Sequence, residues 1–494
     1  MKNTIFLLVL LTTVISCKKD FLETSPTNSL DDAAVFTTTA NANNVINGIY
    51  RYLYSRFDQQ NQPGQGGVML LLDFMGEDIH QAIATWYTAA GSGTGGWITH
   101  RNDQSGYVNY PFRLYYRCIG NANAIIANVD NSVGTQADKN RLKAEALSMR
   151  AWSYFNLVQI FGKRYDSTAI PNTQLGVSMP LDPKDIQLPR STVEQVYAQI
   201  NKDLNDAVTL FSSASAPVNK SHLSLRATYA IIARVALTQQ YYHRAAQFAQ
   251  QVISLGGSSL MTNAEYQAGF NNINNPEWIW GAFVQDDQGD TFGSYMAQIA
   301  LDANTTYMRG APKRINQILY DWIPTTDIRK TMWEPAPTTT NFPLPTTAFV
   351  RQPYMSRKFK IRALPTIGDV PYIRLAEMYL ILAEANARIG RESQAQQALF
   401  TLAKNRNPSY VLSTNTGQNL LNEIYNNKRV EFWGEGHRFF DLKRLNLSLD
   451  RTVVPNYVSN SVGGVMQIAA GTNSWQFAIP ISELQANTNS TPNP

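Results

Sequence analysis

A helical hairpin that occurs twice constrains the fold of this chain more than any other feature of its sequence. Residues Tyr229–Ile253 align without a gap on Tyr379–Ala403. The identical pairs are Tyr229/Tyr379, Ile231/Ile381, Ala233/Ala383, Ala245/Ala395 and Gln247/Gln397. Both copies read as helix, tight turn and helix, with small alanines where two helices must approach closely. A chain with such units buries the apolar face of each hairpin against a neighbouring one.

Hairpins of this kind, repeated over about 34 residues, are typical of tetratricopeptide architectures. The alternative is two unrelated hairpins of similar composition. Helical periodicity also covers Ala40–Asp58, Phe112–Val129 and Leu142–Phe161, and Ser191–Glu194 carries the capping-box pattern that starts a helix. We therefore expect a mostly α fold, with a tetratricopeptide-like helical repeat scaffold of about four helix pairs. The scaffold is expected over about residues 36–58, 105–256 and 371–445.

Two loop-rich insertions interrupt this periodicity, at residues 59–104 and 257–370, and residues 446–494 form a C-terminal segment. The first insertion is rich in glycine, glutamine and aromatic residues, and the second in proline, asparagine and threonine. Long ordered loops in a compact protein usually carry function. We therefore expect the insertions to form an irregular, ligand-binding subdomain beside the scaffold.

Composition excludes several classes of protein. Of the 494 residues only 16% are charged, the formal net charge is +5, and no concentrated basic face that would indicate nucleic-acid binding is present. Two cysteines are too few for a disulfide framework or a cysteine zinc site. The five histidines lie far apart in the sequence, and none belongs to an HExxH motif. We expect no metal.

The sequence also offers no positive sign of catalysis. Gly91–Gly96 satisfies the spacing GxGxxG, but no strand precedes it and no helix follows, as a dinucleotide site requires. The GxSxG motif of a hydrolase elbow is absent, and no pair of carboxylates stands out as an acid/base couple. We expect a binding protein that is not an enzyme and has no cofactor.

The N-terminal sequence predicts a signal peptide for export and a lipid anchor. Residues 1–16 have the basic start and short apolar run of a signal peptide, and they end directly before Cys17. The sequence Val14-Ile15-Ser16-Cys17 resembles a bacterial lipobox, in which the cysteine is diacylated after cleavage. Residues 17–35 would then be a lipid anchor and polar tether. An ordinary secretory signal that ends near a cysteine is the alternative.

Aromatic residues in the insertions are the candidate ligand contacts. Trp86, Tyr87 and Trp97 flank a glycine-rich stretch, and Tyr295, Tyr307 and Arg309 in the second insertion could complete a site. Aromatic rings stack on the C–H faces of sugars, while amides bind hydroxyl groups. The alternative is that the rings pack the loops onto the scaffold. For Trp278 and Trp280, which share a strand-like run, packing is the better interpretation.

Motifs along the helical segments resemble the SusD/RagB family of outer-membrane lipoproteins. The matching segments, in the family's order, are Arg150–Leu157 with Phe161-Gly162, Leu188–Tyr197, Arg374–Ala385 with Gly390, Glu431–Arg444 and Phe477–Asn487. Lys428 departs from the pattern, because the family usually has a glutamate there. The charged motif residues are expected to make partly buried ion pairs rather than bind ligand. They are Arg374, Glu384, Glu431, Glu435, Arg438 and Asp441.

The resemblance implies a lipid-anchored protein on the outside of the outer membrane. Such proteins cap a SusC-like TonB-dependent transporter and capture glycans, or sometimes peptides, for import. We therefore expect an oligosaccharide ligand and no nucleic acid. Peptide capture in the same kind of transporter, a glycoside hydrolase on a helical scaffold, and a purely structural lid for the barrel are the alternatives.

Overall fold

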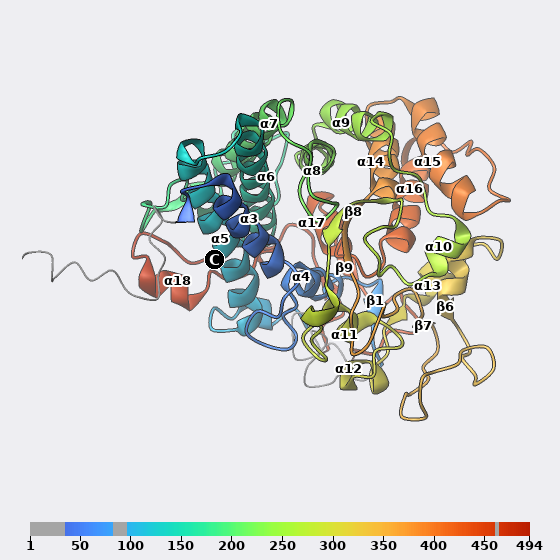
Figure 1. Cartoon of the computed structure of the whole chain (residues 1–494). Coiled ribbons are helices and arrows are strands. Elements are labelled where there is room, and N and C mark those ends of the chain that lie inside the picture. Colours follow the sequence, from blue (N-terminus) through green and yellow to red (C-terminus); the bar gives the residue numbers. More distant parts are fainter. Residues whose placement is uncertain (1–34, 83–95, 460–463) are drawn as a thin grey trace, which may run out of the picture.

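The computed structural model describes residues 35–82, 96–459 and 464–494. Long helices form the larger part of the molecule, and short helices and strands gather along one side of them (Figure 1). The scaffold helices are α3 (Thr39–Tyr52), α5 (Gly106–Asn128), α6 (Gln136–Phe161), α7 (Val193–Phe211), α8 (Leu225–Thr238), α9 (Tyr242–Ser254), α14 (Leu375–Arg388), α15 (Glu392–Arg406), α16 (Gly417–Glu431) and α17 (Arg438–Arg444). The mostly α, tetratricopeptide-like fold class is confirmed.

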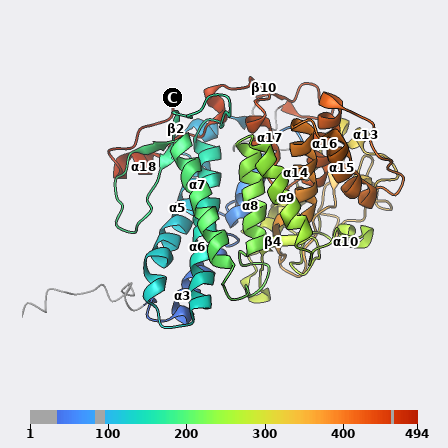
Figure 2. The ribbon, with the colours of Figure 1, turned by 90° about the horizontal axis from the view of Figure 1, so that it is seen from above.

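The two copies of the repeated hairpin fold in the same way. One copy is α8 and α9, the other is α14 and α15, and α9 packs directly against α14. Seen from above, these helices continue the row begun by α5, α6 and α7 (Figure 2). Ala245 and Ala395 are fully buried where the helices approach each other. The repeat in the sequence is therefore a repeat in the structure.

Helix α3 ends six residues earlier than the pattern Ala40–Asp58 predicts. The reason is tertiary: the carbonyl of Leu53 accepts hydrogen bonds from the Gln65 amide and the Tyr372 hydroxyl, both at 2.7 Å. That carbonyl is therefore not free to continue the helix. The periodicity of residues 40–58 does not reveal these hydrogen bonds, because both donors come from later segments of the chain.

Helix α7 begins with a capping box, but one residue later than the sequence suggests. Thr192 is the N-cap, and its side chain accepts a hydrogen bond from the Gln195 amide at 3.2 Å. The Gln195 side chain accepts in return from the Thr192 amide at 2.9 Å. The expected pair was Ser191 and Glu194. Glu194 instead accepts hydrogen bonds from Asn172.

The first insertion is more regular than expected, because it contains the helix α4 (Gly64–Asp73). Every residue of α4 is buried. A helix that is covered on all sides shows no alternation of apolar and polar faces. This explains why the periodicity of the sequence does not predict α4.

Short elements make up the second insertion and the C-terminal segment. The helices are α10 (Asn263–Gln267), α11 (Tyr295–Ile299), α12 (Thr306–Arg309), α13 (Gln317–Trp322) and α18 (Ile481–Ala486). The 3₁₀ helices there are η5 (Asp286–Gln288), η6 (Ile328–Met332) and η8 (Asn473–Trp475), whereas η3 (Thr99–Arg101) lies in the first insertion and η4 (Val129–Asn131) directly follows α5.

One four-stranded antiparallel sheet ties the two insertions together. Its order is β1-β5-β7-β6, with β1 (Ile79–His80), β5 (Arg314–Ile315), β7 (Met355–Ser356) and β6 (Trp333–Glu334). In the register His80 lies opposite Arg314, and Arg314 lies opposite Met355. The antiparallel pairs are β2 (Leu175–Ser178) with β3 (Arg190–Thr192), β4 (Trp278–Ala282) with β8 (Val370–Arg374), and β9 (Leu449–Asp450) with β10 (Gln467–Ile468).

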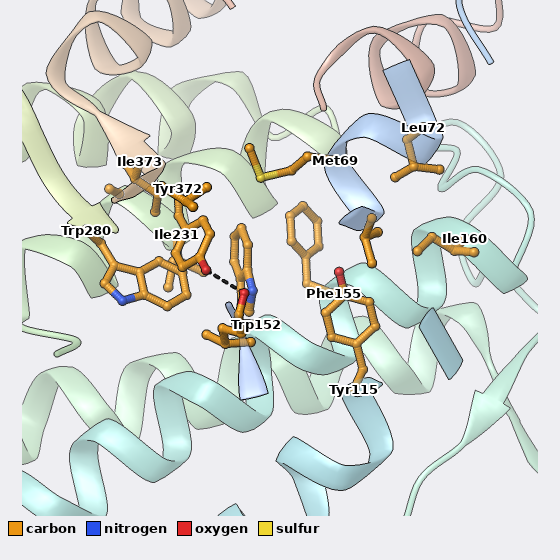
Figure 3. Packing of buried hydrophobic residues seen from close by; sticks show 14 of the residues in the cluster. Met69, Leu72, Tyr115, Trp152, Phe155, Ile160, Ile231, Trp280, Tyr372 and Ile373 are labelled. Atoms are coloured by element: carbon orange, nitrogen blue, oxygen red, sulfur yellow. Dashed lines mark hydrogen bonds between the residues drawn. The ribbon is translucent and has the colours of Figure 1, made fainter. Parts of the chain in front are cut away.

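The main core lies where the helices meet β4 and β8. Trp278 and Trp280 are fully buried, so the packing interpretation of this pair is confirmed. The ring of Trp280 meets Trp152 edge-on, with 5.2 Å between the ring centroids, and Tyr372 at 5.0 Å (Figure 3). This core fixes the second insertion firmly to the scaffold.

The charged motif residues also hold the scaffold together. Arg444 binds Glu384, Arg438 binds Glu77, and Lys428 donates to Asp441 at 2.7 Å. Arg374 binds Glu431 and Glu435 in the interior. The expectation that these residues form ion pairs is confirmed. Lys428, which departs from the family pattern, takes part in a pair of its own.

Candidate functional site

The sequence-predicted site residues fall into two groups. Cys17, Trp86 and Tyr87 lie outside the described residues, as does nearly all of the Gly91–Gly96 stretch. Trp97, Tyr295, Tyr307 and Arg309 lie within them. Burial and contacts can therefore be given only for the second group of candidate ligand contacts.

Trp97 is a packing residue in this structure. Its side chain is 5% exposed, and its indole N–H donates to the carbonyl of Met75 at 2.9 Å. Its ring lies edge-on to Trp475, with 4.7 Å between centroids. In this structure the Trp97 ring packs its loop onto the body of the protein.

Tyr295 and Tyr307 lie in α11 and α12, with side chains 2% and 1% exposed. The Tyr295 hydroxyl donates to the carbonyl of Gly434 at 2.7 Å, and Tyr307 lies 3.4 Å from the Gln60 amide oxygen. Both ring faces are therefore covered, and stacking on a sugar would require them to move. Arg309, beside Tyr307, is half-exposed and reaches Asn304 at 3.4 Å.

The structure thus brings some candidates together and separates one from the rest. Tyr295, Tyr307 and Arg309 come from neighbouring helices of the second insertion, and Tyr307 touches the first insertion through Gln60. Trp97 instead contacts the C-terminal segment. Ligand contact stays a prediction for all six candidates, which are Trp86, Tyr87, Trp97, Tyr295, Tyr307 and Arg309.

Trp322 is a candidate contact that the sequence reasoning missed. Its side chain is 36% exposed, and it is the one exposed tryptophan among the residues that the structure describes. Ile318, one turn earlier on α13, is also exposed. An apolar pair at this spacing on an outward helix face is the signal that could have identified the position.

Tyr320 is a buried residue of α13, and Tyr354 packs against it. Tyr320 and Tyr354 meet edge-on with 5.4 Å between ring centroids, and the Lys330 ammonium lies 3.8 Å from the Tyr320 ring centroid. Tyr354 directly precedes β7 and has a positive φ of 67°. Tyr354 and Lys330 thus support α13 through Tyr320, and the Trp322 indole that α13 exposes can stack on the C–H face of a sugar.

The four-stranded sheet positions this surface. The Arg314 guanidinium donates to the carbonyl of Pro353 at 2.7 Å, and so holds the turn that carries Tyr354. The Lys313 ammonium donates to the carbonyls of Tyr307 and Ala311, and burial lowers its pKa to about 7. Since β5 pairs with β1, both insertions contribute backbone to one rigid support.

The described residues hold one free cysteine and no metal-binding cluster. Within the described parts of the chain, no group of three or more His, Cys, Asp or Glu side chains is arranged to hold a metal ion. Burial raises the pKa of the Cys118 thiol to about 12. No helix in those parts is both long enough and apolar enough to cross a bilayer.

A helical-repeat scaffold with an irregular insertion subdomain is the architecture that this chain shares with known proteins. Residues 20–237 match the family described as "Starch-binding associating with outer membrane", and residues 248–494 match the SusD family. The chain belongs to the SusD/RagB family.

Relatives match over nearly the whole chain. SusD-like protein P2 of Formosa agariphila is 25% identical over all of this chain and 99% of its own length. The crystal structure of a SusD-like carbohydrate binding protein from Bacteroides vulgatus is 25% identical, with a TM-score of 0.78 over 92% of this chain and 98% of that one. A SusD superfamily structure from Bacteroides thetaiotaomicron shares the fold, with 24% identity and a TM-score of 0.77 over 92% of this chain and all of that one.

Proposed function

We propose that this protein captures oligosaccharides at the cell surface and passes them to a SusC-like TonB-dependent transporter. The observation that carries the proposal is the match to a SusD-like carbohydrate binding protein over nearly the full length of both chains. The family itself is associated with the outer membrane. The name of that relative supports sugar capture as the function of this scaffold.

The chemistry of the insertion surface supports a sugar ligand. Trp322 offers an exposed indole, and Ile318, one turn earlier on α13, adds exposed apolar surface beside it. Such a surface binds by stacking and hydrogen bonds, without a covalent step, so we propose a binding protein that is not an enzyme. A shallow surface must offset the lost freedom of the ligand, and we expect affinities of about 1 μM or weaker for a single site.

Isothermal titration against matched panels of oligosaccharides and peptides tests the proposal. Trp322→Ala should weaken sugar binding by about tenfold, the loss expected when an aromatic anchor worth more than 1 kcal/mol is removed. Tyr241→Ala is the matched control, because Tyr241 is an equally exposed aromatic residue on the turn between α8 and α9.

Three outcomes would contradict the proposal. Binding of peptides but no sugars would indicate peptide capture. Release of products from a labelled polysaccharide, abolished by one Asp or Glu substitution, would indicate a glycoside hydrolase. Uptake that survives mutation of the insertion residues would indicate a structural lid for the transporter.

A further inference from the structure

A hollow, which we name the α3 groove, lies between the scaffold helix α3 and the start of the second insertion. It has a volume of about 520 Å³ and is formed by α3, by residues 218–222 and by residues 281–288. None of the insertion residues discussed above as ligand contacts lines it. Its size is that of an ordinary small-molecule site, typically about 300–1,000 Å³. The groove is therefore a candidate site separate from the Trp322 surface.

The floor of the α3 groove is rigid. Tyr50 and His222 both bind the fully buried Glu145, at 2.6 Å and 2.8 Å, and their rings lie 4.6 Å apart. Beside them the Tyr372 hydroxyl donates to the carbonyl of Leu53. A floor held by buried hydrogen bonds does not have to be ordered when a ligand arrives, which lowers the cost of binding.

One wall of the groove is a row of side chains with unused hydrogen-bonding groups. Asn44, Asn47 and Arg51 are exposed and follow each other at three- and four-residue spacing, so they share one face of α3. Within the part of the chain that the structure describes, their side chains make no hydrogen bond or ion pair. Gly48 lies in the same row and leaves room between them, since a Cβ built there meets nothing within 4 Å.

The opposite wall is aromatic and amide-rich. Phe283 follows the strand β4 and remains 38% exposed, while Gln285 and Gln288 come after it. The Tyr54 hydroxyl donates to the Gln288 side chain at 2.6 Å and joins this wall to the end of α3. A hydrogen bond thus joins the two sides of the groove.

This combination of groups selects a class of ligand. Arg51 is the one Arg, Lys, Asp or Glu side chain among the described lining residues, so the groove is nearly neutral and does not suit a nucleic acid. Free amides bind hydroxyl groups, and an exposed ring packs on C–H surfaces. We propose that the α3 groove is a second binding site, which takes a segment of an oligosaccharide chain. The inference rests on the proposed function for its class of ligand, but not for its location.

The experiment fills the groove without removing any contact. Gly48→Leu adds an apolar side chain that cannot bind hydroxyl groups, at a helix position with open space. Gly120→Leu is the matched control, because Gly120 is an exposed glycine inside α5, also with nothing within 4 Å of an added Cβ, and it does not line the groove. Melting temperatures of both variants confirm that they are folded.

Titration is carried out on the full chain with maltohexaose, xylohexaose, mannohexaose and a galacturonate hexamer. In the Trp322→Ala background, we expect one of these sugars to retain a binding event. Adding Gly48→Leu should weaken that event at least tenfold, and adding Gly120→Leu should leave it unchanged. Asn44→Ala/Asn47→Ala should act like Gly48→Leu, whereas Gln418→Ala/Asn422→Ala, which removes two exposed amides one turn apart on α16, should not.

The outcomes separate this inference from the proposed function. If the wild-type protein binds sugars but Gly48→Leu behaves like Gly120→Leu, the α3 groove is not a sugar site and the proposed function stands. If the wild-type protein binds none of a wider sugar panel, the proposed function fails and the class of ligand proposed for the groove fails with it.

Discussion

Arg374 lies at the centre of a network of buried charges. Its guanidinium binds Glu431 at 2.9 Å and Glu435 at 2.8 Å, and Arg406 binds Glu277 at 2.6 Å and Glu431 at 3.0 Å. These groups have lost nearly all contact with water. The loss of hydration is offset only while every charge keeps its partners. The network therefore stabilises the fold as a unit, and each member depends on the others.

Removing Arg374 should be severely destabilising for this reason. Arg374→Met leaves buried carboxylates short of a cation, and we expect the free energy of unfolding to fall by about 3–5 kcal/mol. Urea unfolding measures the loss. The control is Lys202→Met, which breaks an exposed ion pair with Asp206 and should cost about 0–1 kcal/mol. Equal losses in the two variants would contradict a structural role for the network.

The buried ammonium of Lys443 should make the free energy of unfolding depend on pH. Its ammonium donates to the carbonyls of Gln159 and Gly162 at the end of α6, and burial lowers its pKa to about 7. In the unfolded chain a lysine has a pKa of about 10.4. Between these values the unfolded chain binds more protons, so the contribution of Lys443 to stability rises with pH.

The prediction is measured as a difference between two proteins. The free energy of unfolding of the wild type minus that of Lys443→Met should increase from about pH 7 to about pH 10, by at most about 1.4 kcal/mol per pH unit. Urea titrations at both ends of this range and midway between them give the slope. A difference that does not change with pH would show that Lys443 titrates normally in the folded protein.

At the scale of elements, Gly48 is a weak point of α3. Glycine inside a helix costs about 0.5–1 kcal/mol relative to alanine, and an added Cβ at Gly48 meets nothing within 4 Å. Gly48→Ala should therefore raise the free energy of unfolding by about that amount, seen as a higher melting temperature. Gly434→Ala should do the opposite, because Gly434 has a φ of 84° and its added Cβ would lie 2.7 Å from Ile299.

The elements also show what local sequence can predict. Helices α8, α9, α14 and α15 were predicted because their apolar faces repeat along the chain, and each pairs with its neighbour in sequence to form a hairpin. Helix α4 was missed because it is buried all round and has no polar face. The early end of α3 was missed because Gln65 and Tyr372 take the carbonyl of Leu53.

At the scale of the whole molecule, the candidate site depends on contacts between distant segments. Trp97 packs on Trp475, and β1 pairs with β5 from the other insertion. Nothing near Trp97 in the sequence distinguishes a ring that packs from one that binds ligand. Trp322 was missed although the apolar pair that it forms with Ile318 is a local signal, because long-range packing decides which tryptophans are covered. The sequence predicted the insertions as the place of function, but not which of their rings are free.

The lipid anchor gives a prediction for the protein in the cell. Cys17 lies outside the described residues, and its expected diacylation rests on the lipobox-like Val14–Cys17. Stable anchoring takes two lipid chains or an equivalent pair of signals, and a diacylated cysteine supplies both chains on one residue. Cys17→Ala should therefore move the protein from the membrane pellet to the soluble fraction after cell lysis. Cys118→Ala is the control, because that thiol is buried in the core and should leave membrane retention unchanged. Membrane retention of Cys17→Ala in cells that lack the partner transporter would contradict lipidation, since neither the lipid nor the transporter would then hold the chain.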